Sequence, residues 1–210
     1  MTRLATWLVV SVLLIACENQ THPVFSPAPT PTPHTAPTAA IIQSNDAPPT
    51  LAVCLGSGPI DVYIATLGAS GTPLADRASS QWALLTNEGA RAGAISIFAS
   101  SPTACKAELG STTNTKSIAS LVAQFGDEGE ADRAWQSGVF GFAPPPAGVL
   151  VPGLTRGAST GLGLSSFTYD RPSIRLASWH RSVFVALVVA SNLDVTTFKA
   201  ATAAIDPRLN

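Results

Sequence analysis

The placement of proline sets where a folded domain can begin in this chain. Eight of the seventeen prolines lie within residues 18–50, which contain no glycine and two charged residues. Proline has no backbone N–H, so a run such as Ser26 to Pro33 favours the polyproline II conformation over a helix or a sheet. At about 3.1 Å per residue, residues 18–50 as a whole would extend towards roughly 100 Å. We therefore expect residues 17–50 to form an extended tether and a single domain to occupy residues 51–210.

The N-terminus has the pattern of an export signal. Arg3 provides a positive charge, and residues 4–16 are almost wholly apolar. A helix of this length reaches about 20 Å, which is shorter than the hydrocarbon core of a bilayer at roughly 30 Å. A charged start followed by a short apolar stretch is typical of a secretory signal peptide rather than of a membrane-spanning helix. We expect residues 1–16 to be a signal peptide.

Residues 14–17, Leu-Ile-Ala-Cys, resemble the lipobox of bacterial lipoproteins, in which an aliphatic and a small residue precede a cysteine. The resemblance covers the first seventeen residues. It implies cleavage between Ala16 and Cys17 and a lipid on Cys17, where two or more acyl chains hold a protein stably on a bilayer. The implied location is the bacterial cell envelope, with the domain outside the cytoplasm. The alternatives are an ordinary signal peptide with a chance cysteine, or an uncleaved anchor.

The charge balance argues against a nucleic-acid partner. From Leu51 onward the chain has 11 Lys plus Arg and 11 Asp plus Glu, and 12% of all its residues are charged. Nucleic-acid-binding domains carry a basic surface, and a polybasic patch is also what attracts a protein to anionic lipids. We expect no nucleic acid as a partner, and we expect contact with the membrane only through the lipid on Cys17.

Apolar periodicity predicts both strands and helices in the first half of the domain. Apolar residues alternate over 60–67, which favours a strand. A threonine–proline pair then precedes an amphipathic helix over 73–86, with Trp82 as its core anchor. A short strand is expected over 94–99 and a second, brief helix over 101–110.

The second half is expected to contain more strands. Asp127 and Glu130 have the spacing of a capping box, so the acidic cluster there marks the start of a helix that reaches Trp135. A Ca²⁺ site is not expected, because the alternating aspartates of a calcium loop are absent. Asn192 or Asp194 can cap a final helix. We expect strands over 117–125, 162–169, 173–179 and 183–190.

Residues 183–189 are apolar at every position, which is typical of a central strand covered on both faces. The elements together predict an α+β domain whose sheet of about six strands is mixed or largely antiparallel, with about four helices. We expect a βαβ-like first part and a three-stranded meander near the C-terminus. The strand over 117–125, the acidic helix, the late hairpins and the capped final helix give the domain a loose resemblance to small α+β sensor and PsbP-like domains of bacterial lipoproteins and receptor kinases. No binding residue is carried over from it.

Cys54 and Cys105 remain once Cys17 is assigned to the lipid. An even number of cysteines in an exported domain favours a disulfide, the alternative being two buried free thiols. Closing a loop of about fifty residues would stabilise the fold by roughly 4 kcal/mol. The spacing matches neither a CxxC redox motif nor zinc-ligand pairs, so we expect a structural link and no metal or cofactor.

Residues 157–161 match the G-x-S-x-G pattern of serine hydrolases. Asp170 and His180 follow in hydrolase order, which would make Ser159 the nucleophile, His180 the base and Asp170 its orienting partner. No buried strand leads into the motif and no helix is expected after it. We therefore expect no enzyme and keep the hydrolase as an alternative.

Four arginines gather in the C-terminal half around Asp170. If several of their side chains converge on one site, they would bind an anionic ligand or partner. If the side chains lie apart, they are solvated residues of the hairpins. The candidate residues are Arg156, Arg171, Arg175 and Arg181.

The leading functional hypothesis is a non-enzymatic lipoprotein whose domain binds a small ligand or another envelope protein. Besides the hydrolase, the alternative is a purely structural envelope spacer, which would lack a pocket of ligand size.

Overall fold

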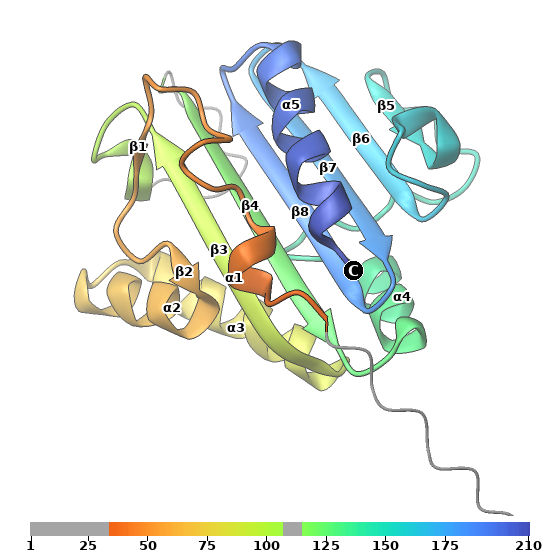
Figure 1. The fold of residues 1–210 in the computed structure, drawn as a ribbon, viewed down its shortest axis with the longest axis horizontal. Helices are drawn as coiled ribbons and strands as arrows, with labels where there is room; N and C mark the ends of the chain where they lie inside the picture. The colour runs from red at the N-terminus through yellow and green to blue at the C-terminus, as the bar shows by residue number, and fades with distance from the viewer. Residues whose placement is uncertain (1–33, 107–114) are drawn as a thin grey trace, which may run out of the picture. The chain divides into compact units, whose positions relative to one another are not determined.

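The computed structural model describes residues 34–106 and 115–210 (Figure 1). The predictions of a signal peptide, of a lipid on Cys17 and of a proline-rich run over 26–33 concern residues outside this part and stay predictions. The helices described are α1 (Pro37–Ala40), α2 (Ile60–Ala69), α3 (Pro73–Asn87), α4 (Glu128–Ser137) and α5 (Val195–Ile205). The strands are β1 (Ala52–Val53), β2 (Gly58–Pro59), β3 (Ala90–Ala99), β4 (Ser117–Phe125), β5 (Leu154–Arg156), β6 (Ser166–Arg171), β7 (Ile174–Arg181) and β8 (Phe184–Ser191).

A single antiparallel sheet forms the centre of the domain, in the order β1-β3-β4-β8-β7-β6-β5, with β2 paired to β3. This confirms the α+β class and the largely antiparallel sheet. The sheet has eight strands in the described residues. The extra ones, β1, β2 and β5, have only two or three residues each, too few to give a periodic sequence signal. The expected three-stranded meander is β6–β7–β8.

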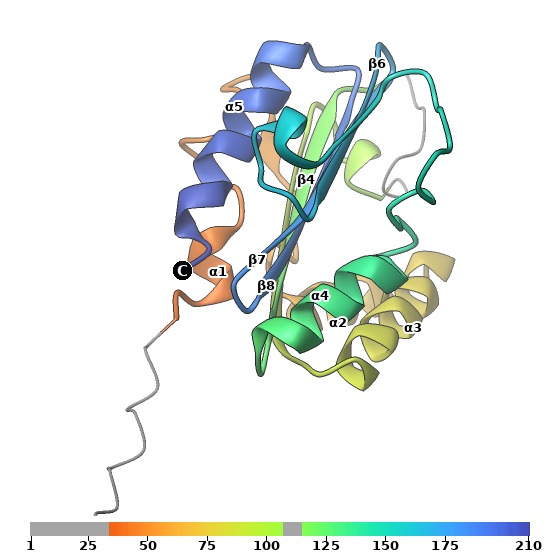
Figure 2. The same ribbon diagram turned by 90° about the vertical axis from the view of Figure 1, so that its right-hand side faces the viewer.

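Helices cover both faces of the sheet (Figure 2). Every residue of β8 is buried, and its side chains alternate between two cores. One core contains Val185 and Leu187 and lies under α2, α3 and α4, while the other contains Phe184 and Val188 and lies under α5. The prediction of a central strand covered on both sides is confirmed.

The segment 60–67 is a helix and not the predicted strand. Ile60, Tyr63 and Leu67 are buried, at the spacing of one helical face, whereas Val62 is 47% exposed. The alternation of Ile60, Val62 and Ile64 is typical of a strand. Burial of Tyr63, three residues after Ile60, instead gives the segment the 3.6-residue period of a helix. Because α2 and α3 follow each other directly before the first long strand, β3, and all strand pairs are antiparallel, the expected βαβ-like first part is also wrong.

The observed first residues of the helices agree more closely with the positions expected from the sequence. Asp127 caps α4 by accepting a hydrogen bond at Oδ1 from the backbone N–H of Glu130 at 2.8 Å, and Asp194 caps α5 in the same way. Helix α3 begins at Pro73 as expected, and its Trp82 packs against β3 where Gly93 lies. A Cβ at Gly93 would come within 2.7 Å of the Trp82 ring, so glycine permits the close approach of helix and strand. The expected helix over 101–110 is a 3₁₀ turn, η1 (Ala104–Lys106), in the residues described.

Residues 37–51 pack on the sheet and form what we call the N-terminal strap. Ile41 and Ile42 are 5% and 1% exposed and belong to the same core as α5. The backbone N–H of Ile42 donates to Ser120 Oγ at 2.9 Å, and Ser120 Oγ is 2.9 Å from Ser96 Oγ. The expected tether therefore does not extend to Thr50. The abundance of proline concealed the apolar pair that anchors this segment.

The strap also joins the C-terminus of the chain. Arg208 binds both carboxylate oxygens of Asp46, at 2.7 and 2.9 Å, and donates to the carbonyl of Ile41 at 3.2 Å. The backbone N–H of Thr35 donates to the carbonyl of Asn210 at 3.1 Å. The two ends of the described chain are thus held together beside α5.

We expect Asp46→Asn to lower the free energy of unfolding by about 1–2 kcal/mol near neutral pH, because it removes the charge from a bidentate pair. Hydrogen bonds from Arg208 hold the pKa of Asp46 below its ordinary value of 3.8. A lowered folded-state pKa stabilises the protein above the unfolded-state pKa, and this contribution is lost as the pH falls through the folded-state value. Urea denaturation at about pH 7 and about pH 3 should show the difference between wild type and variant shrinking in acid.

Asp206→Asn is the matched control, since Asp206 pairs with Arg181, whose side chain is 42% exposed. An exposed pair contributes less than about 1 kcal/mol. Equal losses for the two variants, or a difference at Asp46 that does not change with pH, would contradict the assigned role of the Asp46–Arg208 pair.

Candidate functional site

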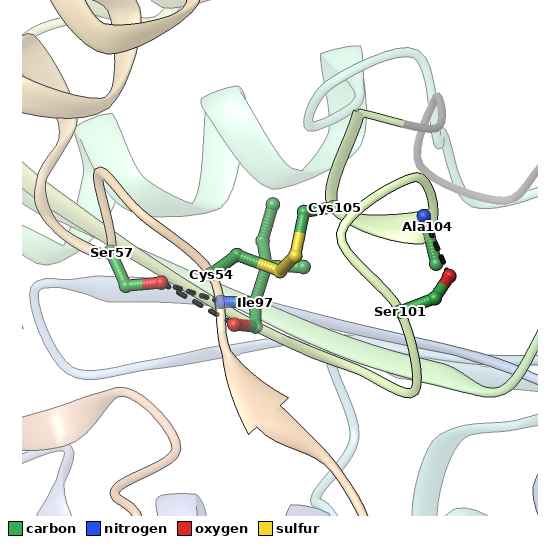
Figure 3. Close-up of a disulfide and its surroundings, with 6 residues drawn as sticks. All are labelled: Cys54, Ser57, Ile97, Ser101, Ala104 and Cys105. Atoms are coloured by element: carbon green, nitrogen blue, oxygen red, sulfur yellow. Dashed lines mark hydrogen bonds between the residues drawn. A yellow bond between two sulfur atoms is a disulfide. The ribbon is translucent and has the colours of Figure 1, made fainter.

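Cys54 and Cys105 form a disulfide, as the sequence predicted (Figure 3). The bond joins the segment after β1 to η1 across a sequence separation of 51 residues. The Cys54 side is also fixed to β3, because the backbone N–H of Cys54 donates to the carbonyl of Ile97 at 2.8 Å and Ser57 Oγ accepts from the N–H of Ile97 at 3.1 Å. Three segments distant in sequence are therefore held at one corner of the sheet.

A pocket of about 380 Å³ lies at this corner, between α2, β1, the end of β3 and η1. Apolar groups dominate its walls, and they include Val53, Leu55, Tyr63, Leu67, Pro102 and the disulfide. Its volume falls in the range of about 300–1,000 Å³ that small-molecule sites occupy. The corner therefore has the size and the apolar lining of a ligand pocket.

The turn after the disulfide closes one side of the pocket. Gly56 has φ +85°, and a Cβ there would come within 2.9 Å of Thr66 Cβ on α2. Glycine is required for both the left-handed backbone and the close approach. The turn consequently packs directly on the helix and leaves the Leu55 side chain, 88% exposed, at the rim.

Tyr63 combines burial with a hydroxyl that other described residues do not bind. The residue is 6% exposed, and no other described residue forms a hydrogen bond with its hydroxyl. Burial raises the pKa of Tyr63 above its ordinary value of 10.0, so the group keeps its proton near neutral pH. The hydroxyl proton is therefore available to an acceptor atom on a ligand.

The catalytic triad of the alternative hydrolase hypothesis is not assembled. Ser159 is exposed in the 3₁₀ turn η2 (Gly157–Thr160). Asp170 lies opposite Arg175 in the β6–β7 ladder and forms an ion pair with it at 2.8 Å. His180 lies further along β7, at five residues from Arg175, which corresponds to roughly 16 Å. Asp170 therefore does not orient His180.

His180 has partners of its own. Its Nδ1 is 3.7 Å from Asp132 Oδ1 on α4, and its Nε2 is 2.7 Å from the carbonyl oxygen of Ser182. A carbonyl only accepts hydrogen bonds, so Nε2 carries a proton and is engaged. The ring borders an open, polar hollow of about 540 Å³, which also includes Leu164. The nitrogen that a general base would use is occupied in this arrangement.

The four candidate arginines do not converge, and two of them stabilise loops. Arg156 donates to the carbonyl oxygens of Pro145 and Pro146 and so holds the proline-rich loop before β5. Arg175 donates to the carbonyl oxygen of Leu193, at the start of the segment that leads into α5. Both guanidinium groups are committed to the chain itself.

The other two arginines lie on separate parts of the surface. Arg181, at the far end of β7 from Arg175, binds both carboxylate oxygens of Asp206 at 2.7 and 2.8 Å. Arg171 lies over the Tyr169 ring, 6.0 Å from its centroid. Each of the four guanidinium groups thus has a contact of its own within the chain, so these contacts do not favour the expected shared anion site, which stays a prediction.

Tyr63 and the pocket were missed by the reasoning from sequence. With 60–67 interpreted as a strand, Tyr63 faced away from Ile60 and carried no expected role. The signal that would have found it is the helical spacing of Ile60, Tyr63 and Leu67. The Cys54–Cys105 pairing was predicted, but a pairing alone does not show that a hollow lies beside it.

No protein-family model, curated protein or solved structure matches the chain. Within residues 34–106 and 115–210, no three His, Cys, Asp or Glu side chains are grouped as metal ligands. In the same residues, no helix combines the length and the apolarity needed to cross a membrane.

We expect joint replacement of Cys54 and Cys105 by alanine to lower the free energy of unfolding by about 2–4 kcal/mol, because the unfolded chain regains the entropy of an open loop. Urea denaturation of the oxidised wild type and of the double variant measures this difference. Dithiothreitol should shift the unfolding midpoint of the wild type and leave that of the variant unchanged. A wild type whose midpoint is the same with and without reductant would contradict the role of the bond.

Proposed function

We propose that this protein is a lipid-anchored protein of the bacterial envelope whose domain binds a small, largely apolar ligand without catalysis. The observation that carries the proposal is the 380 Å³ pocket with a largely apolar lining, which includes Tyr63, a residue 6% exposed whose hydroxyl has no hydrogen bond to another described residue. An open apolar pocket exposes apolar surface to water, and a ligand with a hydrocarbon part would cover that surface.

The extracytoplasmic location is supported by two independent features. Residues 14–17 resemble a lipobox, and disulfides persist mainly in oxidising compartments, where the Cys54–Cys105 bond would be formed. Because the N-terminal strap is packed, only residues 18–33 are left for a tether. At about 3.1 Å per residue this segment would span roughly 50 Å, about half of the initial expectation.

The separation of Asp170 from His180 supports binding over hydrolysis. An apolar segment of another envelope protein is a second candidate occupant of the same pocket. It is favoured by Val53 and Leu55, which are 56% and 88% exposed at the rim, because exposed apolar side chains beside a groove are typical of a protein contact.

We expect the uncharged fluorophore N-phenyl-1-naphthylamine to bind the pocket and to increase in fluorescence. The protein would be the full chain with Cys17→Ala, so that no detergent competes for an apolar site. Leu55→Asp should weaken binding at least about tenfold, because it places a charge against an apolar ligand. Fluorescence titration measures the affinity.

Leu150→Asp is the matched control, because Leu150 is 97% exposed and is not part of the pocket wall. It should bind the fluorophore as the parent protein does, and both variants should keep the parent's unfolding midpoint. Equal affinities for Leu55→Asp and Leu150→Asp would contradict binding at this pocket.

Cys17→Ala in the otherwise native chain should release the protein from membranes when the chain is expressed in a bacterium. The reason is that the acyl chains on Cys17 would be its only strong attachment. Cell fractionation and immunoblotting measure the distribution. The Cys54→Ala/Cys105→Ala variant is the control and should stay with the membrane fraction, whereas membrane retention of Cys17→Ala would refute the lipid anchor.

A further inference from the structure

The hydroxyl groups around the pocket fall into two classes by hydrogen bonding. Ser100 Oγ accepts from the backbone N–H of Lys116 at 3.2 Å, and Ser101 Oγ accepts from that of Ala104 at 3.3 Å. Each of these two serines has one proton, and no hydrogen bond in the described residues uses it. Both side chains are therefore available as donors on the side of the pocket formed by β3 and η1.

The α2 side of the pocket has the opposite arrangement. Thr66 Oγ1 donates to the carbonyl of Val62 at 2.8 Å, and Ser70 Oγ donates to the carbonyl of Thr66 at 3.1 Å. Their protons are consumed within the helix. The exception on α2 is Tyr63, whose hydroxyl is without a partner among the described residues and keeps its proton.

The charge of the described lining has a single sign. Among the lining residues of 34–106 and 115–210, Lys106 at the end of η1 is the one that is charged, and no described residue pairs with its ammonium group. It lies on the same side as the two free serine hydroxyls. Four of the described lining residues, Tyr63, Ser100, Ser101 and Lys106, thus carry hydrogen-bond donors, one of them cationic, and none of the described lining residues is a carboxylate.

We infer that the ligand is an aliphatic monocarboxylate. Its hydrocarbon part lies against the apolar wall of Val53, Leu55 and Leu67, and its carboxylate accepts hydrogen bonds from Lys106 and the hydroxyl groups. A carboxylate has two oxygens and no proton near neutral pH, so it matches a set of donors. This inference rests on the proposed function and adds the charge class of the ligand.

The test compares three ligands with the same ten-carbon chain, which are decanoate, 1-decanol and decyltrimethylammonium. Isothermal titration calorimetry at about pH 7, where decanoate is ionised, would use the full chain with Cys17→Ala at ligand concentrations below micelle formation. We expect decanoate to bind at least about tenfold more tightly than decanol, and the cation to bind more weakly than decanol.

Lys106→Gln should weaken decanoate binding about tenfold and leave decanol binding unchanged, because only the carboxylate uses the charge. Lys199→Gln is the matched control, since Lys199 is an exposed lysine of α5, on the other face of the sheet. It should bind both ligands as the parent protein does.

Equal affinities for decanoate and decanol, or decanoate binding that Lys106→Gln does not weaken, would overturn the inference. If Leu55→Asp still abolishes binding in that case, the proposed apolar pocket stands without its anionic preference. If none of the three compounds binds and none displaces N-phenyl-1-naphthylamine, the proposed function fails together with the inference.

Discussion

The burial of β8 on both faces is the constraint on which the rest of the structure depends. Its side chains supply two separate cores, and each core must be covered or apolar surface would be exposed to water. Three helices cover one face, whereas α5 and the N-terminal strap cover the other (Figure 2). Ile41 and Ile42 are therefore part of the fold, although they lie in a stretch dominated by proline.

The pocket lies at one corner of the first of these layers. Helix α2 reaches this corner with Tyr63 and Leu67, and the described residues after β3 form the 3₁₀ turn η1 there. The disulfide keeps that turn in place, since three residues of 3₁₀ helix bury too little surface to do so alone. The covalent link thereby fixes one wall of the pocket.

Much of the fold was predictable from the sequence, because the capped helices and the long strands each carry a local signal. Asp127 caps the helix that it was expected to cap, and Asp194, one of two expected candidates, caps α5. The hairpins after residue 162 need only local contacts. The errors arose where tertiary packing decided the outcome. The segment that begins at Ile60 alternates like a strand but buries one helical face, and burial of the strap depends on Ser120 and Arg208, far away in the sequence.

The candidate site was not predictable, because it joins Tyr63, the Cys54–Cys105 bond and Lys106 from three distant segments.

The attachment of the strap decides how the domain would respond to mechanical load. The chain enters the domain through the strap, on the α5 face of the sheet, and the pocket belongs to the opposite face. A pull on the N-terminus would be carried first by the bidentate Asp46–Arg208 pair and the backbone bond from Ile42 to Ser120. If the chain is held by its N-terminus, as proposed, tension would therefore load the α5 face of the sheet first, and the pocket on the opposite face would be loaded only after these strap contacts give way.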